Sequence, residues 1–185
     1  RSIPLTKRQL WMARRKALFL FLGAPEPLSS PKALADFDGV KLAPHLDGLP
    51  GSDYIAEINR LGLPVLVHGG EHTPPAWIEH ALLPLLEVPL IIAHLGIFPA
   101  AEHLLDAALE LAKTRRNVYL DTSGVWFAEF IRYAAETVPE KILFGSDAPL
   151  THPGVAWRQV ASVVENDAVL EGIAHKNAQR LFRKK

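Results

Sequence analysis

The apolar run Pro64-Val-Leu-Val67 ends directly in His68 and is followed by a glycine pair, Gly69-Gly70. Five further short apolar runs, each bounded by Gly, Pro or a polar turn, lie at residues 17–22, 40–42, 90–93, 118–120 and 141–144. Runs of this length that are apolar at consecutive positions are typical of strands buried on both faces, as in parallel sheets. The sequence therefore predicts buried parallel strands at these places.

The predicted strands recur at a nearly constant interval. With Lys41, Val67, Ala93, Leu120 and Gly145 as markers, the spacings are 26, 26, 27 and 25 residues. Segments with apolar residues at helical spacing lie between the strands, at 54–61, 99–115 and 127–138. Strands that alternate with helices in this way predict right-handed crossovers and hence a parallel α/β sheet.

Two architectures share this pattern, the open doubly wound sheet and the closed (β/α)8 barrel. Equal spacing without a glycine-rich G-x-G-x-x-G turn favours the barrel. A closed barrel has eight strands, whereas residues 1–185 contain about six apolar runs. We therefore expect one α/β domain over residues 1–185, a parallel TIM-type barrel that lacks its first one or two strands.

The composition excludes several classes of protein. In 185 residues, 20 Lys and Arg balance 20 Asp and Glu, and the 49% of hydrophobic residues can form a core of ordinary size. This balance argues against disorder and gives no basic footprint for nucleic acid or an anionic membrane surface. The chain has no cysteine, which excludes disulfides and thiolate metal sites and agrees with a reducing, cytoplasmic location.

The apolar run near the start of the chain has a second interpretation. Residues 17–24 follow Arg14-Arg15-Lys16 and resemble the charged and apolar regions of a signal peptide. The run is too short for a transmembrane helix, and no A-x-A-like cleavage site follows it. We therefore prefer a buried strand for this run.

Polar side chains directly follow three of the predicted strands. His68 follows residues 64–67, His94 follows residues 90–93, and Asp147 follows the run at 142–146. In a barrel, the carboxyl ends of the strands form the rim on which active sites are built. Two imidazoles and a carboxylate there predict a divalent metal site, zinc first with manganese or iron as alternatives, that activates water near neutral pH. Each residue alone also has a structural interpretation, as a hydrogen-bonded histidine or as a cap.

Other basic residues are expected on the same rim. His45, His72 and His152 lie in segments that follow predicted strands, where loops hold substrate contacts. Lys41 is a charged residue inside an apolar run. It either faces the barrel mouth, where it would bind substrate or bridge metal ions, or extends outward along an apolar surface.

Four motifs in register carry a family resemblance. They are Val65-Leu-Val-His68-Gly-Gly, Ile91-Ile-Ala-His94-Leu-Gly, Asn117-Val-Tyr-Leu-Asp121-Thr-Ser-Gly and Ile142-Leu-Phe-Gly-Ser-Asp147-Ala-Pro. Together with the closing Asn177-Ala-Gln-Arg-Leu-Phe182, they make residues 39–182 resemble the amidohydrolase superfamily. The resemblance is to its amidohydrolase-2 branch of metal-dependent TIM-barrel hydrolases.

The resemblance implies a role for each of these residues. His68 maps to a metal ligand that ends the fifth strand, and His94 to a histidine that ligates a second metal or assists the chemistry. Asp147 maps to the aspartate that touches the metal and shuttles protons, and Lys41 lies where some relatives place a metal-bridging residue. The family's first strand carries a His-x-His pair, and no two histidines of this chain are two residues apart. The resemblance thus implies that the pair precedes Arg1 in a longer protein, or that the chain is a remnant without catalysis.

The reaction that the resemblance implies is metal-dependent hydrolysis of an ester, lactone or amide bond in a small molecule. Asp147 would be the general base, and His94 would orient the reactants or stabilise the developing oxyanion. Some relatives instead decarboxylate aromatic acids without redox chemistry. Alternatives from other classes are a barrel that binds a small molecule or partner without chemistry, and a metal-dependent nuclease of the TatD type, which the neutral charge disfavours.

The exposed edge of an incomplete sheet predicts a homodimer.

Overall fold

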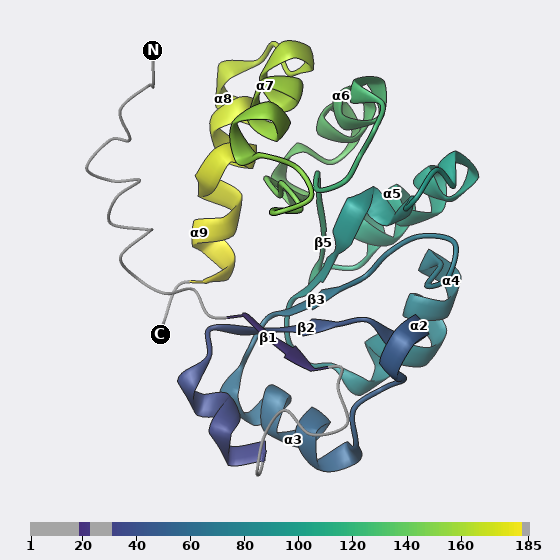
Figure 1. Ribbon diagram of the computed structural model, residues 1–185, viewed down its shortest axis with the longest axis vertical. Helices are drawn as coiled ribbons and strands as arrows, with labels where there is room; N and C mark the ends of the chain where they lie inside the picture. Colours follow the sequence, from purple (N-terminus) through teal and green to yellow (C-terminus); the bar gives the residue numbers. More distant parts are fainter. Residues whose placement is uncertain (1–18, 23–30, 183–185) are drawn as a thin grey trace.

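Six strands form one parallel sheet in the computed structural model, which describes residues 19–22 and 31–182 (Figure 1). The strands are β1 Phe19–Leu22, β2 Gly39–Leu42, β3 Val65–Val67, β4 Leu90–Ile92, β5 Val118–Asp121 and β6 Ile142–Leu143. Their order in the sheet is their order in the chain, and every neighbouring pair is parallel. The predicted parallel α/β sheet is therefore confirmed. Of the run predicted at 17–22, residues 17 and 18 lie outside the described residues.

Helices connect the strands and lie around the outside of the sheet (Figure 1). The α-helices are α2 Pro44–Asp47, α3 Ser52–Leu61, α4 Pro75–Trp77, α5 Leu105–Thr114, α6 Ala128–Thr137, α7 Pro153–Val163, α8 Asp167–Glu171 and α9 Asn177–Leu181. Shorter 3-10 or π-helical segments are η1 Pro31–Asp36, η2 Ile78–Leu82, η3 Leu83–Leu85, η4 Ala93–Gly96, η5 Glu102–Leu104, η6 Pro139–Lys141 and η7 Gly172–Lys176. Within the described ranges, none of these helices has the length and apolar character that crossing a membrane requires.

The predicted helices at 54–61, 99–115 and 127–138 correspond to α3, to η5 with α5, and to α6. The end of α3 shows why such a boundary can be predicted from the sequence. Gly62 takes a left-handed φ of 67° and donates its backbone N–H to the carbonyl oxygens of Asn59 and Ile58. Glycine adopts this conformation without a steric penalty, so it closes the helix and turns the chain toward β3.

Alternate residues of the strands form two different surfaces. The outer rows pack beneath the helices and are fully buried: Val40, Val65, Leu90 and Val118, and then Leu42, Val67, Ile92 and Leu120. The intervening row on the opposite face consists of Lys41, Leu66, Ile91 and Tyr119. Of this inner row, only Ile91 is fully buried. The prediction of burial on both faces is wrong for the inner row, because the six strands described do not close into a ring that would cover it.

Candidate active site

The carboxyl ends of β3 and β4 place two histidines side by side. His68 follows β3, and its backbone N–H donates to the Leu42 carbonyl oxygen at 2.9 Å, which extends the ladder by one residue. His94 lies in η4, directly after β4, and is only 4% exposed. The two ring centroids are 4.9 Å apart. Parallel pairing therefore brings together two residues that are 26 positions apart in the chain.

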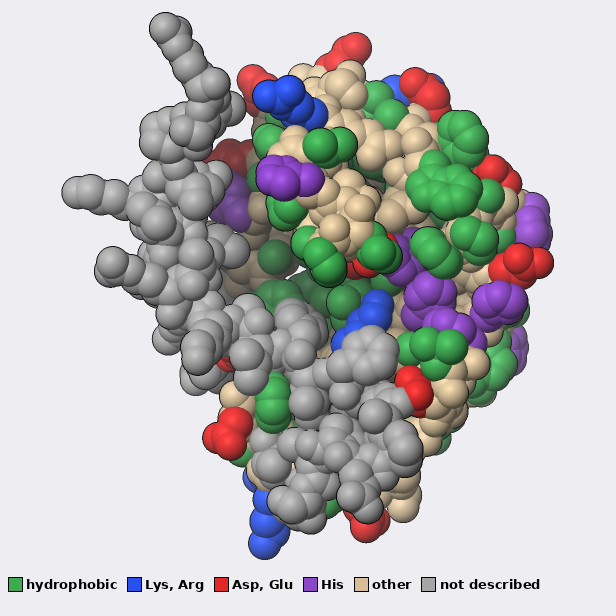
Figure 2. All heavy atoms as spheres, viewed as in Figure 1, with side chains coloured by type: hydrophobic (Ala, Val, Ile, Leu, Met, Phe, Trp, Pro, Cys, Tyr) green, Lys and Arg blue, Asp and Glu red, His purple; other side chains and the backbone are tan. Residues whose placement is uncertain are grey.

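Two more histidines join this pair in what we call the histidine cluster, consisting of His45, His68, His72 and His94. The His45 ring centroid lies 4.3 Å from that of His68 and 6.0 Å from that of His72. Phe98 packs against the cluster, with its centroid 5.2 Å from His68 and 4.9 Å from His94. Figure 2 shows histidine side chains gathered beside a hollow that also holds a basic side chain. Four of the residues predicted on the rim thus share one location.

A glycine lets the loops after β3 and β4 meet at the cluster. Gly70 has φ +149°, and a Cβ there would collide with the carbonyl oxygen of Phe98 and lie 2.7 Å from its nitrogen. The close approach allows Glu71 N–H to donate to the Phe98 carbonyl at 3.0 Å. Phe98 is thereby held against the histidine rings, which is a packing reason for a glycine at this position.

The His68 imidazole is surrounded by basic groups. Burial lowers the pKa of His68 to about 3, and the positive charges of His94, His45, Lys41 and His72 act in the same direction. His68 is therefore neutral at physiological pH and keeps a nitrogen lone pair. The charges that act on His68 are all basic, which adds to the effect of burial and keeps a proton off this ring.

Lys41 lies on the inner row, within range of two carboxylates. Burial lowers the pKa of Lys41, while the negative charges of Asp121 and Asp147 raise it. This surrounding agrees with the interpretation in which Lys41 faces the barrel mouth, and not with the one in which it extends outward over an apolar surface.

Asp147 and His94 face the same small residue. A Cβ built on Gly124 would lie 3.0 Å from His94 Nδ1 and 3.3 Å from Asp147 Oδ2. Asp147 itself has φ 62°, an uncommon conformation for a residue with a side chain and one that recurs at functional sites. The turn that follows is closed by the Asp147 carbonyl oxygen, which accepts hydrogen bonds from the N–H groups of Leu150 at 2.9 Å and Thr151 at 3.3 Å. The next helix, α7, has another residue as its cap.

That cap is His152, which the sequence places on the rim as a substrate contact. Its Nδ1 accepts a hydrogen bond from the backbone N–H of Gly154 at 3.1 Å, at the start of α7. The side chain is exposed, and among the described residues no ring contact links it to the histidine cluster. The structure thus gives His152 a local structural role, which satisfies a free N–H of the first helical turn.

Two polar residues to which the sequence analysis assigns no role hold His94 in place. Asp121, the last residue of β5, accepts a hydrogen bond from the His94 backbone N–H at 2.9 Å. The carbonyl oxygen of Ser123 lies 2.8 Å from His94 Nδ1. The available signal was their position, since the polar run Asp121-Thr-Ser directly follows an apolar run, as His68 and His94 do.

Two observations test whether these residues suit a divalent metal ion. His68 is a neutral imidazole, and His94 contacts a carbonyl oxygen through Nδ1, which leaves the lone pair of its neutral form on Nε2. Neutral imidazole nitrogens and a carboxylate are ligands that zinc accepts. Across residues 19–22 and 31–182, however, no three His, Asp or Glu side chains are grouped so that they could hold an ion. The donor atoms of these residues therefore suit zinc, manganese or iron, but the positions of the described side chains do not make up a complete ligand set. The metal stays a prediction.

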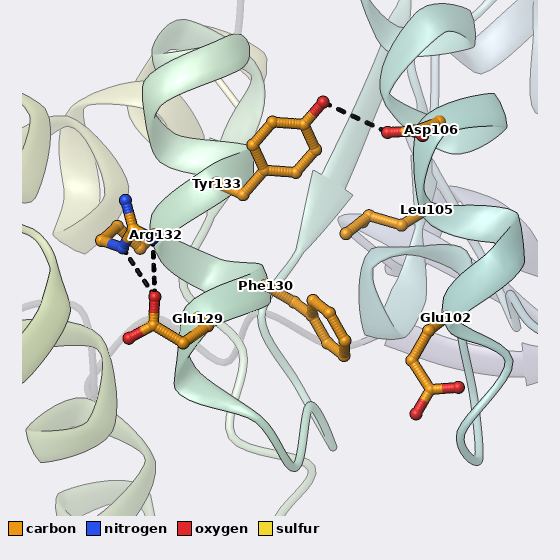
Figure 3. A pocket seen from close by; sticks show the side chains of 7 residues that line it. All are labelled: Glu102, Leu105, Asp106, Glu129, Phe130, Arg132 and Tyr133. Carbon is orange, nitrogen blue, oxygen red and sulfur yellow. Dashed lines mark hydrogen bonds and ion pairs between the residues drawn. The ribbon is translucent and has the colours of Figure 1, made fainter.

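A second hollow lies between η5 with the start of α5 and the start of α6 (Figure 3). It has a volume of about 380 Å³ and is lined by Glu102, Leu105, Asp106, Glu129, Phe130, Arg132 and Tyr133. Tyr133 donates its hydroxyl hydrogen to Asp106 at 3.2 Å, and Arg132 pairs with Glu129 at 2.7 Å. These polar groups are already partnered, and none belongs to the predicted site.

The comparison with protein families agrees with the arrangement at the strand ends. A family model described as Amidohydrolase matches residues 32–184, which include every residue of the histidine cluster. This chain belongs to the amidohydrolase family. The resemblance carried by the four motifs is thereby confirmed. Among curated proteins, no sequence matches this chain.

Solved structures are similar to this amidohydrolase over most of its length. A probable 2-pyrone-4,6-dicarboxylic acid hydrolase from Acinetobacter baumannii is 17% identical, with a TM-score of 0.67 over 95% of this chain and 76% of that chain. An uncharacterised TIM-barrel protein from Bordetella bronchiseptica is 20% identical, with a TM-score of 0.64 over 87% and 64%. A 2,6-dihydroxybenzoate decarboxylase from Rhizobium is 19% identical, with a TM-score of 0.53 over 94% and 73%.

At these identities the similarities establish the fold. The predicted parallel TIM-type barrel is confirmed, and the open doubly wound sheet is not the architecture of this amidohydrolase. The chain spans 76% of the length of the Acinetobacter protein, and the described residues contribute six strands, where a closed barrel has eight.

Proposed function

We propose that this amidohydrolase hydrolyses an ester, lactone or amide bond in a small organic carboxylate. The observation that carries the proposal is the meeting of Asp147, His94 and Lys41 at the carboxyl ends of β6, β4 and β2, in a barrel of this family. A carboxylate beside an imidazole and an ammonium group can remove a proton from water and counter the negative charge that develops on the substrate.

Asp147 is the proposed general base, and His94 orients the attacking water. In its neutral form His94 has an unprotonated Nε2, which accepts a hydrogen bond from water and does not donate one to an oxyanion. As the water oxygen bonds to the carbonyl carbon, one proton passes to the Asp147 carboxylate. When the tetrahedral species collapses, the bond to the leaving oxygen or nitrogen breaks and Asp147 returns the proton to that atom. Atoms and charge balance, and no redox partner takes part.

The basic groups around His68 support a carboxylate as the substrate class. Lys41, His45 and His72 act on His68 as positive charges, whereas Asp121 and Asp147 act on Lys41, and Asp47 acts on His45, as negative charges. An anionic substrate group would pair with the Lys41 ammonium group. The probable hydrolase from Acinetobacter was crystallised with citric acid, which is itself a carboxylate.

The proposal includes a divalent metal, zinc first and manganese or iron as alternatives. By donor type its ligands from this chain would be His68, His94 and Asp147, although within the described residues these side chains are not grouped closely enough to hold an ion together. Such an ion, when bound, supplies Lewis-acid polarisation of the carbonyl group.

Non-oxidative decarboxylation is a second candidate, favoured by the structural similarity to the Rhizobium decarboxylase. In that reaction the bond between a ring carbon and its carboxylate breaks, carbon dioxide leaves, and a proton adds to the ring carbon. A protonated Asp147 would supply that proton.

A substrate screen with matched variants tests the proposal. The purified chain is assayed on lactones, aryl esters and hydroxybenzoates, with acid release and carbon dioxide release measured separately. We expect Asp147→Asn to lower kcat by about 10²–10⁴-fold, because the amide cannot take the proton. The control Asp106→Asn, on the surface of α5, should match the wild type. Full activity in Asp147→Asn would contradict the general-base role.

Elemental analysis tests the metal separately. We expect roughly one or two ions per wild-type chain and none in a His68→Ala/Asp147→Ala double variant. An active chain without metal would contradict the metal part alone. A chain without metal, without activity and with unfolding unchanged by a chelator would favour a barrel that binds a small molecule or partner without chemistry.

Two expectations about the whole protein also stay proposals. A free edge of the sheet would pair with a second copy to give a homodimer, and the lack of cysteine favours a cytoplasmic location. Light scattering after size-exclusion chromatography tests the first of these, and a monomer would contradict it.

A further inference from the structure

A chain of hydrogen bonds runs from Asp121 through Ser123 to His94. Ser123 Oγ lies 2.5 Å from Asp121 Oδ1 and 3.0 Å from His94 Nδ1. The Ser123 carbonyl oxygen is also 2.8 Å from that nitrogen. Asp121 is 7% exposed, Ser123 5% and His94 4%. Water therefore does not compete for these bonds, and the low local dielectric strengthens them.

The partners decide which ring nitrogen of His94 carries the proton. A carbonyl oxygen only accepts hydrogen bonds, so the contact with Ser123 O requires a proton on Nδ1. The Ser123 hydroxyl donates its hydrogen to the Asp121 carboxylate, so it too accepts from Nδ1. Neutral His94 thus has its lone pair on Nε2.

Asp121 also holds the backbone on which His94 lies. Its Oδ1 accepts hydrogen bonds from the backbone N–H groups of His94 and Ser123, each at 2.9 Å. His94 and Leu95 have φ values of 61° and 50°, a conformation that residues with a Cβ seldom adopt. A buried carboxylate that binds both segments keeps the His94 ring and its acceptors in register.

We infer that Asp121, acting partly through Ser123, is a positioning residue that holds His94 in one orientation and in the Nδ1-protonated tautomer. This inference deepens the proposed function and rests on it for the catalytic consequence. That consequence is that the unprotonated Nε2 of His94 can accept a hydrogen bond from water or bind a ligand. Asp121 and Ser123 act on the reaction through His94, and Asp121 also acts through its charge on Lys41.

Nuclear magnetic resonance of the imidazole nitrogens tests the inference without an activity assay. Protonated and unprotonated ring nitrogens differ widely in their 15N chemical shifts, and comparison with His94→Gln assigns the His94 signals. We expect one tautomer in the wild type and in Asp121→Asn, which keeps Oδ1 as an acceptor. Asp121→Ala should give a mixture of tautomers, whereas the control Asp106→Ala should leave the signals unchanged. A folded Asp121→Ala protein with the wild-type pattern would overturn the inference.

A second pair of variants keeps the test decisive if Asp121→Ala does not fold. Ser123→Ala removes one of two acceptors at Nδ1, and Asp121→Asn weakens the bond that orients the Ser123 hydroxyl. Both should move the Nδ1 proton resonance upfield, whereas Ser162→Ala on exposed α7 should not. An unmoved resonance in both variants would overturn the inference.

Kinetics then separates positioning from the proposed function. With an active substrate, Asp121→Ala should lower kcat by about 10–100-fold and change KM less, with recovery toward wild type in Asp121→Asn. Equal kcat in wild type and Asp121→Ala would overturn the catalytic consequence. A wild type that is inactive on every substrate would overturn the proposed function, while the tautomer measurement still decides the inference about Asp121.

Discussion

Replacement of His68 by glutamine should make folding less sensitive to acid. Burial and the surrounding bases lower the pKa of His68 to about 3 in the folded protein, from an ordinary value of 6.5. Between these two pH values the unfolded chain is therefore protonated at His68, whereas the folded chain is not. The stability contributed by neutral His68 is complete above about pH 6.5 and is lost progressively as the pH falls from about 6.5 toward about 3.

The size of the effect follows from linkage. Between about pH 7 and about pH 5, an imidazole that titrates normally only in the unfolded state reduces the free energy of unfolding by about 2 kcal/mol. The side chain of His68 is partly exposed, so solvent screening lowers the expected loss to about 1 kcal/mol. Glutamine has a similar polar side chain without a titrating group, so this contribution disappears in His68→Gln.

Urea unfolding followed by tryptophan fluorescence measures the difference. Wild type, His68→Gln and the control His103→Gln, an exposed position in η5, are compared at both pH values with a chelator present. Wild type and His103→Gln should lose about 1 kcal/mol more on acidification than His68→Gln does. Equal losses in all three proteins would falsify the argument, since His68 would then titrate alike in both states.

Two further substitutions test the packing and the charge of the site. Gly70→Ala should destabilise the protein by at least about 2 kcal/mol, since the new Cβ collides with the Phe98 backbone. Gly51→Ala, where a Cβ meets no atom within 4 Å, should change the free energy of unfolding by less than about 1 kcal/mol in the same urea assay. Lys41→Met should raise KM for a carboxylate substrate by about 10–100-fold, because a hydrogen-bonded charge is lost. An unchanged KM would remove Lys41 from the proposed binding site.

The candidate site was predictable where it depends only on strand ends. His68 and His94 directly follow strands, and the carboxyl ends of parallel strands coincide whatever the helices between them do. Asp147 follows β6 by the same rule. The role of Asp121 was not predictable in this way, because its hydrogen bond to His94 depends on how β4 and β5 pair and on the left-handed turn in η4.

Two histidines in loops after strands show what the strand-end pattern cannot predict. His45 and His152 both follow predicted strands, yet His45 packs on His68 whereas His152 caps α7. In the sequence the two are equivalent candidates. The difference arises because His45 lies in the short helix α2, directly after β2 and beside the β3 loop, whereas His152 directly precedes a longer helix whose first N–H groups need an acceptor.

The sequence by itself determined the parallel α/β architecture, the barrel family and the line of polar residues along one edge of the sheet. Alternation of strands and helices leaves few topologies open, and consecutive apolar residues lie in the core in nearly any of them. Only the tertiary structure decided that the charges of Asp121 and Asp147 act on Lys41, that His152 caps α7, and that the Ser123 carbonyl oxygen faces Nδ1 of His94. These features depend on contacts a few ångströms long between segments distant in the chain, and such contacts leave no periodic signal in the sequence.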